Sequence, residues 1–254
     1  MKLFNGDIER LSSISNYVEI TVNDTTTSLL LQGDCSKVLP DILKADTQLS
    51  SRAIIVTDPP FNIGYKYNTY KDKMDEQQYY EQLGALVKSL PSVVIHYPEN
   101  LYRLSFEIQK IPTRVISWVY NSNTPRQHRD IAFFDTVPDF NKVRQPYKNL
   151  NDKRIKERIA NGSTGAKLYD WFNINQVKNV NKEKTAHPCQ MPLQVMENII
   201  GVLPDDAIII DPFMGSGTTG EAVKTMNVKQ NVQRGFIGIE LDESYYAIAL
   251  NRLF

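Results

Sequence analysis

Ala207-Ile208-Ile209-Ile210-Asp211-Pro212-Phe213-Met214-Gly215-Ser216-Gly217-Thr218-Thr219 joins an apolar run to a glycine-containing turn and the start of a helix. The apolar run is typical of a strand that is buried on both faces. Gly215 and Gly217 permit positive φ and close approach of a ligand to the backbone. Thr218 or Thr219 can cap the helix that follows, whose free N–H groups attract an anion. The stretch therefore predicts a strand, a ligand-binding turn and a helix in succession.

Short apolar runs of this kind alternate with longer amphipathic stretches along the chain. The strand candidates are residues 28–32, 53–57, 92–96, 113–119, 131–135, 207–210 and 235–239. The helix candidates are residues 36–44, 76–90, 99–109, 192–202, 218–226 and 243–251. The alternation predicts an α/β fold with a doubly wound, mostly parallel sheet. Ligands bind such sheets at the carboxyl ends of the strands.

The composition is ordinary for a soluble globular protein, with 41% hydrophobic and 23% charged residues. No run approaches the roughly 18 apolar residues that a membrane helix needs, and residues 1–4 lead into polar sequence rather than a signal peptide. Cys35 and Cys189 have no metal-ligand spacing and predict no disulfide framework. We therefore expect no membrane association and no metal site, and a reducing cytoplasm as the location.

Charge is distributed unevenly. The formal net charge is zero, but residues 141–186 contain eleven Lys or Arg and four Asp or Glu, so the segment carries +7 and the remainder −7. A basic module on an acidic catalytic body would show this asymmetry, which indicates contact with nucleic acid. A solvated surface stretch is the alternative that the charge cluster by itself leaves open.

The strand candidate Gly235-Phe236-Ile237-Gly238-Ile239-Glu240 ends in a carboxylate. An acid about 20 residues after a glycine turn, at the tip of the adjacent strand, is placed to bind ribose hydroxyls. We favour this interpretation of Glu240 over one in which it only begins the next helix. The turn lacks the Lys of a phosphate-binding loop, which disfavours a nucleoside triphosphate as ligand. It also lacks the glycine spacing of a dinucleotide fingerprint, which disfavours a Rossmann dehydrogenase.

A second motif, Asp58-Pro59-Pro60-Phe61, closes the apolar run Ala53-Ile54-Ile55-Val56-Thr57. The prolines fix φ and donate no backbone hydrogen bond, so they give the strand a rigid exit. A carboxylate and a backbone carbonyl can accept two hydrogen bonds from an exocyclic amine, and the ring of Phe61 can stack on a base. The motif is consistent with a site for a planar amine, and equally with a plain loop.

Together the motifs resemble those of β-class S-adenosylmethionine-dependent DNA amino-methyltransferases, in which the catalytic motif precedes the cofactor motif. The resemblance covers nearly the whole chain. It rests on residues 57–64 (catalytic motif), 211–219 (cofactor loop), 238–246 (ribose-binding strand and helix), 187–192 (the family's His-Pro-Thr-Gln-Lys-Pro) and 32–35 (its Gly-Asp segment). Phe61 departs from the family's commoner Tyr, and Cys189 and Met191 depart from its Thr and Lys.

The resemblance implies a circularly permuted, Rossmann-like methyltransferase fold with S-adenosylmethionine as methyl donor. It implies that the target base is held by Asp58, Pro59, Pro60 and Phe61. It implies that the cofactor is bound by Asp34, Asp211, Phe213, Gly215, Gly217, Thr218, Glu240 and His187. The family has Asp in first place when adenine N6 is the usual target and more often Ser for cytosine N4. Asp58 therefore favours adenine, and cytosine N4 is the alternative.

We expect residues 1–140 to form the catalytic half of the domain, 141–186 a small basic target-recognition insertion and 187–254 the cofactor-binding half. The residues expected to contact double-stranded DNA are Lys142, Arg144, Lys148, Arg126 and Arg129. The resemblance makes a homodimer plausible, and a cognate restriction endonuclease is a further partner to consider. The alternative from another class is a DNA-binding subunit that is active only with a partner.

Overall fold

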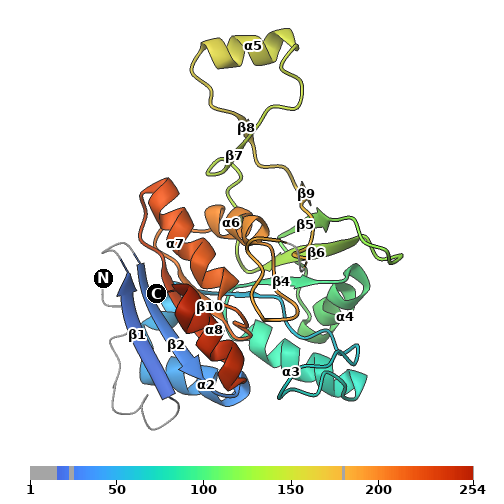
Figure 1. Cartoon of the computed structure of the whole chain (residues 1–254), viewed down its shortest axis with the longest axis vertical. Helices are drawn as coiled ribbons and strands as arrows, with labels where there is room; N and C mark the ends of the chain where they lie inside the picture. Colours follow the sequence, from blue (N-terminus) through green and yellow to red (C-terminus); the bar gives the residue numbers. More distant parts are fainter. Residues whose placement is uncertain (1–15, 23–25, 179–180, 254) are drawn as a thin grey trace.

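The computed structural model describes residues 16–22, 26–178 and 181–253. Its centre is a nine-stranded sheet in the order β1-β2-β11-β10-β3-β4-β6-β5-β9 (Figure 1). The strands are β1 Asn16–Val22, β2 Thr26–Gln32, β3 Ala53–Thr57, β4 Ser92–His96, β5 Arg114–Val119, β6 His128–Phe134, β9 Trp171–Asn173, β10 Ile208–Asp211 and β11 Gly235–Glu240. Strands β2, β11, β10, β3 and β4 pair in parallel, whereas β1 and β6 run antiparallel to their neighbours. The expected α/β, mostly parallel sheet is confirmed.

Helices cover both faces of this sheet. They are α2 Cys35–Ala45, α3 Glu76–Lys88, α4 Pro98–Ile108, α6 Leu193–Gly201, α7 Thr218–Gln230 and α8 Glu243–Leu253, whereas α5 Lys153–Ala160 lies away from the sheet. Successive residues of a strand point to opposite faces. In β2, Leu30 packs in the cluster that contains α6, α7 and α8, whereas Leu29 and Leu31 pack with α2. The sheet is therefore doubly wound. Within the described ranges, no helix is both long and apolar enough to span a membrane.

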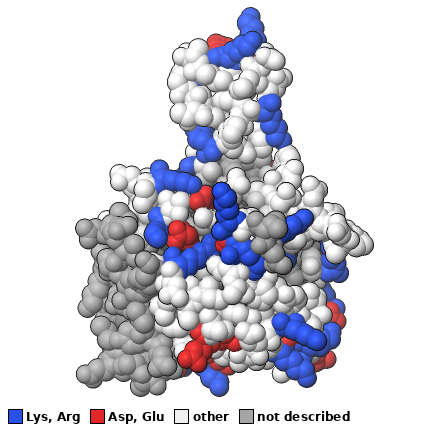
Figure 2. All heavy atoms as spheres, in the orientation of Figure 1, with Lys and Arg blue, Asp and Glu red and all other residues white. Residues whose placement is uncertain are grey.

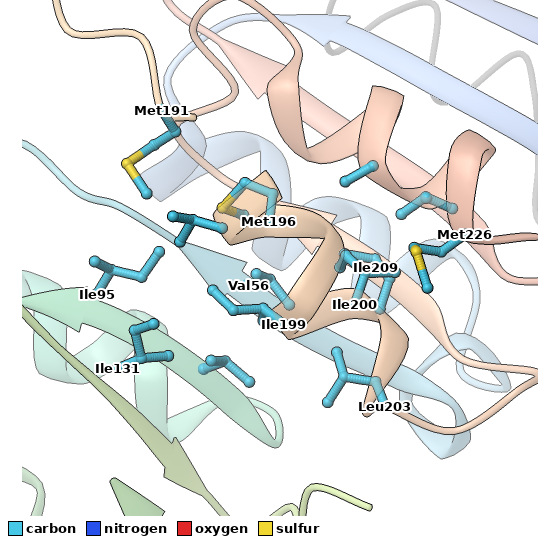
Figure 3. Close-up of a cluster of buried hydrophobic side chains, with 14 of the residues drawn as sticks. Val56, Ile95, Ile131, Met191, Met196, Ile199, Ile200, Leu203, Ile209 and Met226 are labelled. Atoms are coloured by element: carbon cyan, nitrogen blue, oxygen red, sulfur yellow. The ribbon is translucent and has the colours of Figure 1, made fainter. Parts of the chain in front are cut away.

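Helix α6 fixes the centre of the sheet. Its Ile199 and Ile200 are fully buried beside Val56 of β3 and Ile209 of β10, with Met226 of α7 on the same side (Figure 3). Side chains without polar atoms bury here at low cost, and burying each contributes about 1.5–3 kcal/mol. Because β3 and β10 are locked side by side, the segments that leave their carboxyl ends start from neighbouring points.

An arm projects from this body (Figure 1). The short strands β7 Arg144–Gln145 and β8 Ala166–Lys167 pair antiparallel at its base, and α5 lies at its tip. No residue of α5 is buried. The helix begins where the Asp152 carboxylate accepts backbone N–H groups of Arg154 (2.8 Å) and Ile155 (3.3 Å). Strand β1, the arm's elements and β9 are found in addition to the elements expected from the sequence.

Replacing Ile199 with Ala should lower the free energy of unfolding by about 2–5 kcal/mol, because a cavity opens between α6 and the sheet. The matched control is Ile111→Ala, since Ile111 is 90% exposed; it should change that free energy by less than about 0.5 kcal/mol. Urea unfolding followed by circular dichroism measures both. Equal losses in the two variants would contradict the packing described for α6.

Candidate active site

A cavity of about 300 Å³ lies where β2, β3, β10 and β11 end. The parallel pairs β3–β10 and β10–β11 bring Asp58, Asp211 and Glu240 to its wall, although they are far apart in the chain. The expected base-binding and cofactor-binding residues line the cavity, with one exception. The exception is Gly217, where an added Cβ would face Ala249 of α8. No three His, Cys, Asp or Glu side chains of the described residues are grouped as metal ligands.

The turn after β10 has a left-handed backbone at Gly215 (φ 52°) and Gly217 (φ 75°). The expected threonine cap on α7 is wrong: Gly217 occupies the N-cap position, without a side-chain hydrogen bond. The two threonine hydroxyls are engaged elsewhere. That of Thr219 donates to Asp211 (2.5 Å), and that of Thr218 accepts from Arg252 (2.8 Å). These side chains hold the turn in place. Its backbone is also paired, because the N–H of Met214 donates to the carbonyl of Ile239 and the N–H of Gly217 donates to the carbonyl of Met214, both at 2.9 Å.

Glu240 is the last residue of β11 and not the first of α8. Its carboxylate accepts the N–H groups of Gly215 and Asp242, both at 2.8 Å. Each N–H uses one lone pair, so further lone pairs remain for hydroxyl donors. Asp34 lies beside it after β2, where its carboxylate caps α2 by accepting the N–H (3.0 Å) and hydroxyl (2.7 Å) of Ser36.

The cavity is strongly acidic. Its wall contains Asp34, Asp58, Asp72, Asp211, Glu240 and Asp242, and Arg129 supplies a positive charge. Burial raises the pKa of Asp58 to about 6, opposed by the nearby charge of Arg129. Burial likewise raises the pKa of Asp211 to about 7; hydrogen bonds from Thr219 and Phe213 lower it, and the charges of Asp58 and Glu240 add to the rise. A site that accumulates carboxylates in this way favours a cationic ligand.

The catalytic motif is supported from beneath by a hydrogen-bond chain. The ring of Phe61 stacks on His96, with centroids 4.2 Å apart. His96 Nδ1 accepts the N–H of Tyr97 (2.8 Å), so Nε2 carries the proton and donates to the Tyr79 hydroxyl (2.9 Å). That hydroxyl donates in turn to the carbonyl of Pro60 (2.7 Å). Burial lowers the pKa of His96 to about 3, with Arg129 and Arg126 adding to the effect, which keeps the ring neutral.

Asp72 holds the segment that follows the motif. Its buried carboxylate accepts the N–H groups of Asn62 (2.7 Å), Ile63 (3.2 Å) and Tyr65 (2.9 Å). Sequence reasoning missed Asp72, His96 and Tyr79. For His96 a signal was available, because it ends a strand that pairs with β3 and so lies near the Asp58 motif.

The five residues expected to contact DNA lie in three different places. Arg144 and Lys148 are exposed on the arm, where Lys148 lies over the rings of Trp171 (4.1 Å) and Tyr169 (4.8 Å). Figure 2 shows Lys and Arg on the arm and on the body near its base. Lys142 is tied to the body by Asp205 and the carbonyl of Leu203.

Arg129 lies at the cavity instead, and Arg126 is exposed next to Tyr97, a residue of the cavity wall. Arg126 pairs with Glu99 (2.8 Å) and covers the ring of Tyr97 at 4.2 Å. Arg129 lines the cavity, with Nη1 3.3 Å from a carboxylate oxygen of Asp58. Its guanidinium thus contacts the catalytic motif itself rather than an open surface.

The chain resembles known proteins over most of its length. The type II methyltransferase M.HpaI of Haemophilus parainfluenzae is 27% identical over 243 residues, which are 85% of this chain and 73% of that protein. Two solved structures share the fold. The M1.HpyAVI–SAM complex is 21% identical, with a TM-score of 0.57 over 89% of this chain and 98% of that one. The PvuII DNA methyltransferase, described as cytosine-N4-specific, is 16% identical, with a TM-score of 0.61 over 91% and 86%.

The decisive match is to a whole family. Its model, described as DNA methylase and named for the N6 and N4 types, matches residues 53–251. The match spans both the Asp58 motif and the Asp211 turn, whose segments form one cavity. The chain therefore belongs to the N6/N4 DNA methylase family, which methylates DNA with S-adenosylmethionine as the methyl donor.

Proposed function

We propose that this protein transfers a methyl group from S-adenosylmethionine to the N6 amine of adenine at a specific site in double-stranded DNA. The observation that carries the proposal is the placement of the Asp58 carboxylate in the same cavity wall as Asp211 and Glu240. A hydrogen-bond acceptor for an amine and a binding site for a nucleoside would then face the same cavity. The leading Asp of the motif supports adenine over cytosine N4.

The cavity suits S-adenosylmethionine, whose sulfonium and ammonium groups are cationic. The buried carboxylates of Asp211 and Asp58, with raised pKa, gain from a nearby cation. Glu240 would accept the ribose hydroxyls, and Asp34 would lie near the adenine of the cofactor. Nδ1 of His187 is buried and has no hydrogen-bond partner among the described residues, which leaves it for a polar group of the ligand. When bound, the cofactor supplies an electrophilic methyl group.

The residues of the chain then do the positioning. The target amine is unreachable inside a duplex, so the base is flipped into the cavity. Asp58 and the carbonyl of Pro59 accept the two amine hydrogens, which aims the nitrogen lone pair at the methyl carbon. Phe61 stacks on the base. The bond from nitrogen to the methyl carbon would form at the expense of the bond from that carbon to sulfur, with no covalent enzyme intermediate, and the proton released from the amine would pass to solvent. Alignment and electrostatics lower the barrier.

The basic arm and its flanks, residues 141–186, are our candidate for target recognition. Arg144 and Lys148 would contact phosphates there, and the exposed Arg126 would do so beside Tyr97. The type II name of M.HpaI supports a role in restriction–modification beside an endonuclease. A homodimer is part of the same proposal. The cytosine-N4 description of the PvuII enzyme makes cytosine N4 the second candidate target.

Methylation-sensitive sequencing of DNA from cells that express the protein tests the target base. We expect N6-methyladenine at one short sequence, and N4-methylcytosine instead would refute the adenine assignment. Asp58→Ala should slow transfer by at least about 100-fold because the amine loses its acceptor. Its affinity for S-adenosylmethionine should change little. Asp206→Ala, at an exposed residue, serves as the control.

Glu240→Ala should raise the dissociation constant of S-adenosylmethionine about tenfold or more, because a charged acceptor of hydroxyl groups is lost. The variant also frees the N–H of Gly215, which Glu240 holds. Glu243→Ala is the matched control, since Glu243 is exposed at the start of α8. Isothermal calorimetry measures both variants. Unchanged affinity of Glu240→Ala would remove Glu240 from the cofactor site.

The pH dependence of kcat/KM for DNA should show an acid limb at or somewhat below about pH 6, because the bound cationic methyl donor favours the ionised form of Asp58. Asp58 accepts hydrogen bonds from an amine only when ionised, and burial raises its pKa to about 6. Activity is therefore present above this pKa and lost as pH falls through it. The assay uses saturating S-adenosylmethionine, so that the titration of Asp211 in the ligand-free site does not contribute. A profile that is flat from pH 5 to 8 would contradict the role of Asp58.

A further inference from the structure

Arg129 occupies the two contacts that a flipped base would use. Nη1 of its guanidinium lies 3.4 and 3.3 Å from the two carboxylate oxygens of Asp58. The same guanidinium lies over the ring of Phe61, 4.7 Å from the centroid. His96 stacks on that ring at 4.2 Å, so the face left for a base is the one that Arg129 covers. A planar group that donates N–H to Asp58 and stacks on Phe61 is also a description of adenine.

The hold of Arg129 on this place is loose. Both Nη1 contacts are longer than the 2.7–2.9 Å typical of a charge-assisted hydrogen bond. Its Nε is buried without a hydrogen-bond partner among the described residues. The guanidinium also faces the rings of Trp118 (5.3 Å) and Tyr97 (5.9 Å), and the side chain stays 17% exposed. The side chain is therefore not sealed from solvent, and leaving would give up these contacts and a hydrogen bond with Tyr120.

The contacts also explain why a cation is needed when no base is bound. The Asp58 carboxylate is buried, and an unpaired buried charge is costly. Arg129 offsets part of this cost, as the lowering effect of its charge on the pKa of Asp58 indicates. A base that enters must replace both the N–H donor and the stacking partner. Thymine has no exocyclic amine, and its N3–H lies between two carbonyl oxygens that would face the Asp58 carboxylate.

We propose that Arg129 is a positioning residue that holds the amine-binding place at Asp58 and Phe61 in the base-free enzyme and is displaced by the flipped base. The proposal rests on the proposed function. The flipped base competes with Arg129 for the contacts with Asp58 and Phe61. A base can displace Arg129 only if it provides both an amine and a planar ring. Arg129 thereby contributes to the choice of base before any chemistry begins.

The test compares two duplexes that carry the sequence found by methylation sequencing. In one, the target adenine lies opposite an abasic site; in the other, the target position is itself abasic. The affinity ratio is the affinity for the first duplex divided by the affinity for the second. Measured by fluorescence anisotropy with S-adenosylhomocysteine present, it reports insertion of the base alone. Arg129→Ala and Arg129→Met should raise the ratio about tenfold, because no guanidinium has to leave. Arg103→Ala, at an exposed pair with Glu76, should leave it unchanged.

Three results would overturn the proposal. An unchanged ratio would give Arg129 a structural or phosphate-binding role, and a lower ratio would mean that it holds the base. A second readout is the acid limb of kcat/KM, which should move to higher pH in both variants because the charge that lowers the pKa of Asp58 is gone. An unmoved limb would also overturn it. The Met variant keeps the length of the side chain should Ala fail to fold.

The wild-type protein separates this proposal from the one on which it rests. If wild-type protein methylates no DNA, the proposed function fails and this proposal fails with it. If wild-type protein methylates adenine and the affinity ratio does not change in the variants, only the role of Arg129 is refuted.

Discussion

The parallel pairing of β3 with β10 is the constraint on which the site depends. Its register places Ile55 opposite Ile210, so the Asp58 and Asp211 segments leave the sheet side by side. The chain between them forms β4, β5, β6, the arm, β9 and α6 before it returns to the sheet beside β3. The burial of α6 against both strands maintains this pairing. A shift of register would separate Asp58 from the turn after Asp211 even if every side chain were kept.

The same edge concentrates negative charge, and the protein tolerates it in specific ways. Backbone N–H groups stabilise Glu240, a hydroxyl stabilises Asp211, and a guanidinium stabilises Asp58. These contacts do not fully offset the cost of burial, which raises the pKa of both Asp58 and Asp211, and at Asp211 the charges of Asp58 and Glu240 add to the rise. The folded state thus stores electrostatic free energy that a bound cation can release.

The sequence predicted the strands and the two motifs because their signals are local. The apolar run at residues 53–57 and the glycine turn after β10 can be recognised from their own residues, without knowledge of what they pack against. It could not predict the supports beneath the motif. Arg129 reaches Asp58 only because β6 lies antiparallel between β4 and β5, an order that long-range pairing decides. Helix α5 was missed because its residues are largely polar, although the Asp152 cap was a usable signal. The threonine cap failed because Gly217 took that position.

The arm has a consequence for how such a protein can change. Helix α5 buries none of its residues and is held by its own cap and short connections. Substitutions there carry little cost in folding free energy, because surface changes away from packed contacts are usually near neutral. The residues beneath Asp58, by contrast, share hydrogen bonds and ring contacts, so each restrains its neighbours. Helix α5 can therefore accept new side chains at little cost to the fold, whereas a substitution among the residues that support Asp58 disturbs its neighbours.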